Sequence, residues 1–312
     1  MTTSTSIVRC INADIKRGLS NRRFWAVLGI CSLVFFLYQL LSGIWPLTLY
    51  YFASPERLPL YSAIPYDQEG MIRRLNRLTL FGDYFPFLSA AAYAYVILDD
   101  RRKTYCVQQI QRIGFSNYYW GKLISSGLLG GLTGALCEAS ICLQCVLVVG
   151  RNPLIKDAVA YYTKGEMELL AETPQYNWIG WAPDQAYFRM PEPSWQWWMV
   201  AAFKYFVMGC LYGLLAALIA FFISNAVMVY AGPILFALLW DKGSYVILSF
   251  LGEENSLSNL IYRVSLRSDI ESYGSLYHYS LLFFMIILLL IIAKHSQGRI
   301  ERTYLEGGTA DG

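Results

Sequence analysis

Two charged residues stand within long apolar stretches of this chain. Glu138 lies in an apolar run that begins at Trp120, and Lys204 lies in another that begins at Trp195. A charged side chain at membrane depth is costly, and it usually faces a cavity or the interior of a helix bundle. Counted from the ends of the runs, both residues fall at a similar depth. We expect them either to form a buried ion pair between the two segments or to line the path of a transported molecule.

The other residues with chemical potential suggest no reaction. The histidines are His278 and His295, which lie far apart in sequence and predict no histidine-based metal site. Cys142 and Cys145 form a C-x-x-C motif, but it lies in an apolar segment without a nearby histidine, which favours a packing role. We therefore expect this chain not to be an enzyme, and to hold no catalytic residue, no metal and no cofactor of its own.

The stretch 127–134 is rich in glycine but contains no lysine, so it does not match a phosphate-binding loop. Its glycines instead recur at every fourth position, a spacing that lets two membrane helices approach closely. This pattern consists of the pairs Gly127/Gly131 and Gly130/Gly134, and the run around residue 210 repeats it with Gly209, Gly213 and Ala217. The two segments are predicted to make close helix–helix contacts.

Composition indicates the class of protein that holds these residues. Hydrophobic residues make up 56% of the 312 residues and charged residues 15%, which exceeds what a water-soluble core requires. An apolar helix of ~20 residues matches the hydrocarbon thickness of a bilayer. We predict an all-α, polytopic membrane protein with a single membrane domain over 1–312 and six spans near 24–45, 78–98, 120–150, 195–223, 226–251 and 276–293. Pro233 should kink the fifth span, and a break is expected at 241–243.

The distribution of lysine and arginine predicts the orientation. Cations gather in 1–23, in 99–122 and in the tail 294–312, which fall on one side of a six-span protein and should be cytoplasmic. The long connections 46–77 and 151–194 would then lie outside, and no structure is predicted for them. The small net charge of +3 is explained by this topology and gives no indication of a nucleic-acid partner.

The N-terminal segment has the spacing of an amphipathic helix. Ile7, Ile11, Ile15 and Leu19 recur every four residues, and the polar residues Arg9, Asn12, Asp14, Lys16 and Arg17 stand between them. Such a helix is suited to lie along the inner headgroup layer of the membrane. The alternative is a solvated cytoplasmic tail.

The connection 99–122 also has a helical pattern. Val107, Ile110 and Ile113 make a narrow apolar stripe on a helix expected over 101–113, and Gly114 should end it. Ser116 or Asn117 should cap the span that follows. A rigid, charged helix held between two spans could transmit a push from a partner protein, whereas the alternative is an ordinary basic loop.

This pattern resembles the permease subunits of type-2 ABC exporters. In those proteins a basic amphipathic helix leads into the first span, and the second connection carries a coupling helix. The residues that match are Asp100-Arg101, Arg112, Gly114, Tyr118-Tyr119 and Lys122, followed by a short connection Ser224-Asn225 and a fifth span interrupted at Asp241-Lys242-Gly243. The interruption looks like the re-entrant outer hairpin of that family.

The resemblance implies a permease in a bacterial plasma membrane that moves a drug, an antimicrobial peptide, a lipid or a glycan outward. It would bind no nucleotide itself. Separate ABC ATPase subunits holding ATP-Mg would dock on it, and a second permease subunit, identical or related, would complete the transporter in the lipid bilayer. The implied coupling interface consists of Asp99, Asp100, Arg101, Arg102, Tyr105, Gln109, Arg112 and Phe115. A non-transporting membrane scaffold or an intramembrane enzyme is the alternative function.

Overall fold

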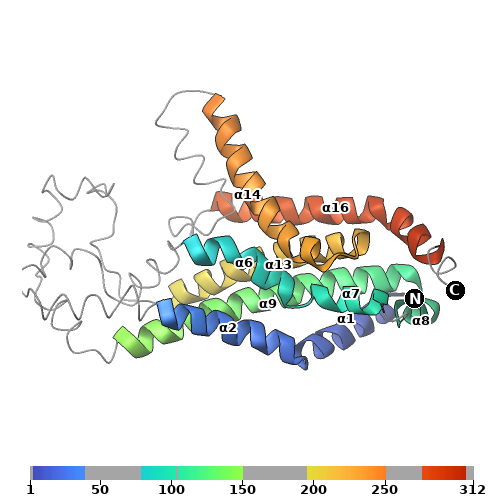
Figure 1. Ribbon diagram of the computed structural model, residues 1–312, viewed down its shortest axis with the longest axis horizontal. Helices are drawn as coiled ribbons and strands as arrows, with labels where there is room; N and C mark the ends of the chain where they lie inside the picture. The colour runs from blue at the N-terminus through green and yellow to red at the C-terminus, as the bar shows by residue number, and fades with distance from the viewer. Residues whose placement is uncertain (1–2, 39–78, 103–104, 150–194, 251–275, 307–312) are drawn as a thin grey trace, which may run out of the picture.

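The computed structural model describes residues 3–38, 79–102, 105–149, 195–250 and 276–306. Within these ranges all regular elements are α-helices, as predicted. They are α1 (Thr3–Leu19), α2 (Arg22–Tyr38), α6 (Thr79–Ala91), α7 (Ala94–Arg102), α8 (Tyr105–Ile113), α9 (Phe115–Val149), α13 (Trp195–Phe222), α14 (Ala226–Phe250) and α16 (Leu276–Glu306). Figure 1 shows that α1 begins, α8 lies and α16 ends at the same end of the bundle.

Four apolar segments in the described part of the chain are long enough to cross a membrane. They are Phe115–Ile141, Ala202–Phe222, Ala226–Gly243 and Tyr279–Tyr304. These helices agree with a membrane protein and correspond to the third to sixth predicted spans. The first predicted span is described only as far as Tyr38, and its remainder lies outside the described residues.

The second predicted span, near 78–98, consists of two helices. Its first helix ends at Ala91, and a new helix begins at Ala94 after a turn over Ala92 and Tyr93. In the turn, the Val96 N–H donates to the Tyr93 carbonyl at 2.9 Å. After the turn, α7 brings Asp99 to Arg23 of α2, and Asp100 to Arg17 of α1 and Lys122 of α9.

The break predicted in the fifth span is wrong. α14 is a continuous helix from Ala226 to Phe250 and passes through 241–243 without interruption. A glycine in a helix costs only about 1 kcal/mol relative to alanine, so Gly243 does not by itself end a helix. Pro233 lies inside α14, and the C-terminal part of the helix leaves the bundle at a steep angle (Figure 1).

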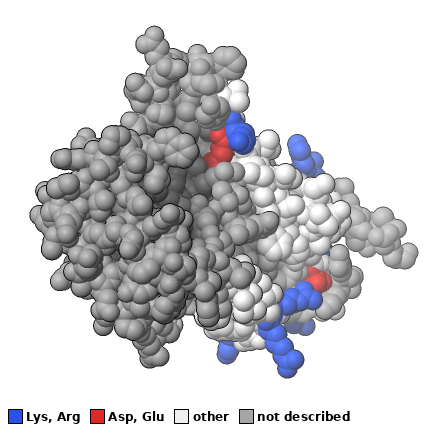
Figure 2. All heavy atoms as spheres, turned by 60° about the vertical axis from the view of Figure 1, so that its left-hand side comes forward, with Lys and Arg blue, Asp and Glu red and all other residues white. Residues whose placement is uncertain are grey.

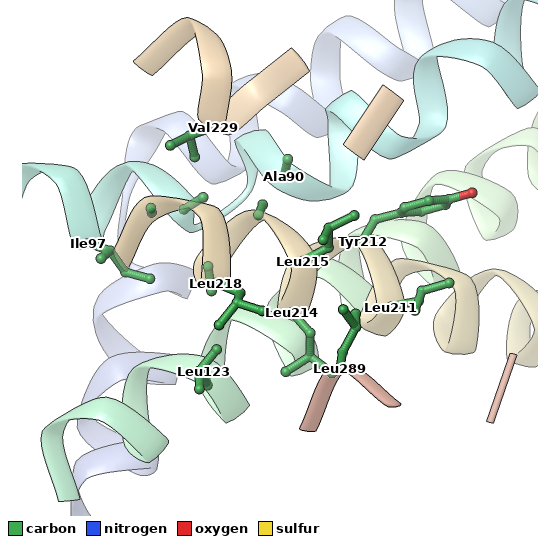
Figure 3. Packing of buried hydrophobic residues seen from close by; sticks show 14 of the residues in the cluster. Ala90, Ile97, Leu123, Leu211, Tyr212, Leu214, Leu215, Leu218, Val229 and Leu289 are labelled. Carbon is green, nitrogen blue, oxygen red and sulfur yellow. The ribbon is translucent and has the colours of Figure 1, made fainter. Parts of the chain in front are cut away.

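The core is organised around α13. Figure 3 shows its leucines between the neighbouring helices, with Leu123 of α9, Ile97 of α7, Val229 of α14 and Leu289 of α16 around them. α13 is thereby enclosed, whereas α14 and α16 leave most of their apolar surface exposed. Exposed apolar helices are expected where lipid is the surrounding solvent.

Glycines set the distance between α9 and α13, as their spacing predicted. A Cβ placed on Gly130 would lie 2.5 Å from the Gly209 carbonyl oxygen, and one on Gly127 would lie 2.9 Å from Leu214. The Ser126 hydroxyl donates to the Gly213 carbonyl oxygen at 2.9 Å. Rising residue numbers on α9 meet falling numbers on α13, so the two helices are antiparallel and their backbones are in contact.

α1 packs along the first half of α9. A Cβ on Gly18 would lie 2.5 Å from Leu129, and one on Gly121 would lie 3.1 Å from Cys10. Asp14 lies between these two contacts and is buried. The N-terminal helix is thus present, but assigning Asp14 to its solvated side is wrong, because one face of the helix carries residue 14 together with residues 7, 11 and 18.

Candidate functional site

α8 ends at Ile113, directly before Gly114, as the sequence predicted. Gly114 adopts a φ of +81°, and its N–H donates to the Ile110 carbonyl at 2.8 Å. This left-handed conformation ends α8, since glycine adopts it without a Cβ clash. α9 begins at Phe115, so the expectation that Ser116 or Asn117 precedes and caps it is wrong. The Asn117 side chain instead donates to the Ile113 carbonyl at 2.7 Å, at the end of α8.

α8 is amphipathic and packs on the bundle with its apolar side. Cys106 is buried, and Val107, Ile110 and Ile113 pack against the core. Burial raises the pKa of the Cys106 thiol, so this cysteine is poorly reactive. The opposite side of α8 exposes Tyr105, Gln108, Gln111 and Arg112. A short polar helix surface is therefore held rigidly at one end of the molecule.

The residues predicted to form a coupling interface separate into two groups. Tyr105 and Arg112 are exposed, whereas Asp99, Arg101 and Gln109 are partly exposed. Asp100 and Phe115 are buried at 1% and 4% exposure, so placing them on a docking surface is wrong. Asp100 and Phe115 instead lie in the interior of the bundle, on the inner side of this connection. The side chain of Arg102 lies outside the described part of the structure.

Near α8 lies a cluster of four charges that joins three helices, with Asp14, Asp100 and Lys122 buried and Arg17 at its exposed edge. The Lys122 ammonium of α9 is 2.7 Å from Asp14 Oδ1 of α1 and 2.9 Å from Asp100 Oδ2 of α7. The Arg17 guanidinium donates to Asp100 Oδ1 at 2.9 Å. We call these four residues the charge cluster. Its formal charges cancel, which is the condition under which buried ions are tolerated.

Aromatic rings and hydrogen bonds complete the surroundings of the charge cluster. The Lys122 ammonium lies 5.6 Å from the ring centroid of Tyr118 and 5.9 Å from that of Tyr93. Burial is the largest single influence on the pKa of Arg17 and would lower it, but the hydrogen bond and charge of Asp100, together with Tyr93 and Asp14, raise the pKa overall. The neighbours that surround Arg17 and Lys122 come from distant parts of the sequence.

A second connection joins α7 to α13 and α16. The Arg101 guanidinium donates to the Ala220 carbonyl at 2.9 Å and lies 5.0 Å from the ring centroid of Tyr304. Tyr304 also packs against Phe115 and Phe221. Asp99, two positions before Arg101 in α7, lies 3.8 Å from Arg23 of α2. Three successive residues of α7 therefore contact different neighbours: Asp99 contacts α2, Asp100 belongs to the charge cluster, and Arg101 contacts α13 and α16.

Sequence reasoning missed the contacts that Asp14, Arg17 and Lys122 make in the charge cluster. A usable signal exists for Asp14, since it lies three residues after Ile11 and seven after Ile7 and so shares their helix face. An acid on an apolar face predicts a buried partner. The identity of that partner requires the fold, because Lys122 is 108 residues away.

Glu138 and Lys204 are both fully buried, as their sequence context predicted. A Cβ on Gly134 of α9 would strike the backbone of Tyr205 of α13. Glu138 lies one helical turn beyond Gly134, and Lys204 is adjacent to Tyr205. The structure thus brings the two charges to the same region of the α9–α13 interface, and their direct pairing stays a prediction.

A double-mutant cycle tests this pairing. We expect Glu138→Gln and Lys204→Met each to lower the thermal stability of the purified protein, because loss of one partner from a buried pair costs about 3–5 kcal/mol. The double variant should lose less than the sum of the two single losses. Simple additivity in detergent-based unfolding measurements would show that the two side chains act separately.

The interactions described at this end of the bundle are ion pairs, hydrogen bonds and aromatic contacts. Among residues 3–38, 79–102, 105–149, 195–250 and 276–306, no group of three or more His, Cys, Asp or Glu is arranged to hold a metal ion. The exposed side of α8 can accept a partner, and the charge cluster can pass a displacement of α7 to α1 and α9.

Comparison with known protein families, with curated proteins and with solved structures finds no match to this chain.

Proposed function

We propose that this chain is the membrane-spanning permease subunit of an ABC-type exporter. It crosses the plasma membrane of a bacterium six times, with both termini and α8 in the cytoplasm. Separate ATPase subunits that bind ATP-Mg dock on α8, and a second permease subunit completes the transporter. The cargo class is a drug, an antimicrobial peptide, a lipid or a glycan.

The observation that carries the proposal is the construction of α8. It is a short helix whose outer side is polar and exposed, whose inner side packs on the core, and whose end is defined by Gly114. A loop that only connects two spans needs none of these features. A rigid surface at the end of a bundle is suited to receive force from a partner that changes shape.

The connections of α7 support the same function. Through Asp100 it is joined to α1 and α9, and through Arg101 to α13 and α16. A push on α8 would therefore act on several long helices at once. Rigid-body rocking of packed helices is a known way to convert a local change into a larger movement.

Charge reversal on α8 tests the proposal. The chain is produced together with a candidate ABC ATPase, and binding of that ATPase and its hydrolysis of ATP are measured. We expect Arg112→Glu to weaken binding about tenfold, equal to about 1.4 kcal/mol, because a rim cation is replaced by an anion. The matched control is Lys242→Glu on α14, which is also exposed but remote from α8.

Equal binding by the Arg112→Glu and Lys242→Glu variants would contradict docking on α8. Absence of any associated ATPase would favour the alternative of a non-transporting membrane scaffold. Both variants must first be shown to insert in the membrane as the unchanged chain does, because Lys and Arg near span ends also direct topology.

A further inference from the structure

The described surface carries exposed cations that have no acidic partner. Among the described residues Lys16, Arg22, Lys294 and Arg299 are exposed and form no ion pair. Asp14, Asp99 and Asp100, the acids of α1 and α7, are each already paired with a cation. Glu301 of α16 lies near Arg299, but the four exposed cations outnumber it, so this described region has excess positive charge. We call Lys16 and Arg22 the elbow cations, because they flank the junction of α1 and α2.

Each pair of cations borders an exposed apolar helix face. On α2, Trp25 follows the elbow cations directly, and the exposed residues Ile30, Leu33, Val34 and Leu37 continue from it. On α16, the exposed face Phe284, Ile287, Leu288, Ile291 and Ile292 ends immediately before Lys294. In Figure 2 the described surface is uncharged over its centre, and its Lys and Arg side chains lie near the edges.

The two cationic regions are linked through α7. Asp99 of α7 contacts Arg23, next to the elbow cations, and Arg101 of α7 lies over Tyr304 near the end of α16. Asp99 and Arg101 differ by about 3 Å along the helix axis, whereas Arg299 and Lys294 precede Tyr304 by roughly 7.5 and 15 Å of helix. α2 and α16 flank the bundle on opposite sides (Figure 1).

The junction of α1 and α2 has a defined geometry. The Asn21 side chain accepts a hydrogen bond from the Arg23 N–H at 2.9 Å and caps α2. The Trp25 indole N–H donates to the Leu19 carbonyl at 2.7 Å, at the end of α1. These bonds hold the elbow cations beside an exposed indole, the side chain that prefers the headgroup layer of a membrane.

We propose that the elbow cations and the pair Lys294/Arg299 bind the phosphates of anionic phospholipid headgroups in one leaflet. A lipid layer surrounds a bundle and can neutralise cations on opposite sides of it, whereas a protein docked at one end of the bundle covers a limited patch. The adjoining apolar faces meet the acyl chains of the same lipids. This inference requires a membrane protein but is independent of the proposed transport function.

Lipid titration tests the proposal. The purified chain is placed in phosphatidylcholine nanodiscs with increasing phosphatidylglycerol, and its melting temperature is followed. We expect phosphatidylglycerol to raise the Tm, with half-saturation shifted about fivefold by Arg22→Gln or by Lys294→Gln, since each cation near an anionic surface contributes about 1 kcal/mol. The matched control Lys242→Gln removes an exposed cation from α14 and should leave half-saturation unchanged.

Three outcomes would overturn the proposal. They are equal Tm values in phosphatidylglycerol and phosphatidylcholine, equal shifts for Arg22→Gln and Lys242→Gln, or a Tm increase produced by soluble glycerol phosphate in pure phosphatidylcholine discs. The last outcome would assign the cations to a free phosphate. Loss of the phosphatidylglycerol effect in about 1 M salt, where the Debye length is about 3 Å, would support the proposed electrostatic contact.

Discussion

Lys122→Met is expected to lower the free energy of unfolding by about 3–5 kcal/mol, because it leaves Asp14 and Asp100 buried with too little positive charge. Methionine has a similar volume, so the change removes the ammonium and leaves little cavity. Lys122 is fully buried and contacts both carboxylates. Arg17 still contacts Asp100, so the unpaired charge is left chiefly on Asp14.

A second substitution distinguishes charge balance from packing. Lys122→Met combined with Asp14→Asn removes one charge of each sign, and it should recover part of the stability that Lys122→Met loses. Lys16→Met serves as the control, because Lys16 is exposed on the same helix as Asp14 and forms no ion pair with a described residue. Denaturant unfolding in detergent gives the free energy of unfolding of the unchanged chain, of the two single variants and of the double variant. If Lys122→Met is no more harmful than Lys16→Met, the charge cluster does not hold α1 to the bundle.

Gly130→Ala is expected to destabilise the protein by about 1–3 kcal/mol or more, because overpacking at a backbone contact has no easy relief. The added Cβ would lie 2.5 Å from the Gly209 carbonyl oxygen and 3.1 Å from the Gly213 Cα. Both atoms belong to the backbone of α13, so α9 and α13 must separate to admit it. Gly127→Ala should cost less, since its Cβ would meet the side chain of Leu214, which can rotate.

Replacing glycine by alanine at an uncrowded position should not lower stability. A Cβ added to Gly298 in α16 or to Gly29 in α2 would meet no atom within 4 Å. Alanine favours helix over glycine by roughly 0.5–1 kcal/mol, so Gly298→Ala and Gly29→Ala should leave stability unchanged or increase it. Thermal unfolding of the four variants measures the difference. Equal losses at Gly130 and Gly298 would show that close contact between α9 and α13 is not what glycine provides.

Local properties of the chain were predictable wherever neighbouring residues determine them. Long apolar runs predicted helices, because a helix satisfies its own backbone hydrogen bonds. The glycine spacing in α9 and α13 predicted their close packing. Gly114 was predicted to end α8, since glycine alone adopts a left-handed conformation at little cost. In contrast, the change from α6 to α7 at Ala92–Tyr93 has no glycine or proline to signal it.

Helical and apolar segments, and the burial of Glu138 and Lys204, could be predicted because these properties follow from the residues within each segment. Which charged side chains pair with one another could not be predicted in this way. The resemblance to exporter permeases implied that Asp100 lies on a docking surface, yet its side chain is buried and pairs with Lys122 and with Arg17, which is 83 residues away. Asp14, Lys122 and Asp100 come from three helices, and each is tolerated inside because the others neutralise it. Such mutual neutralisation depends on how α1, α7 and α9 pack, which no single segment encodes.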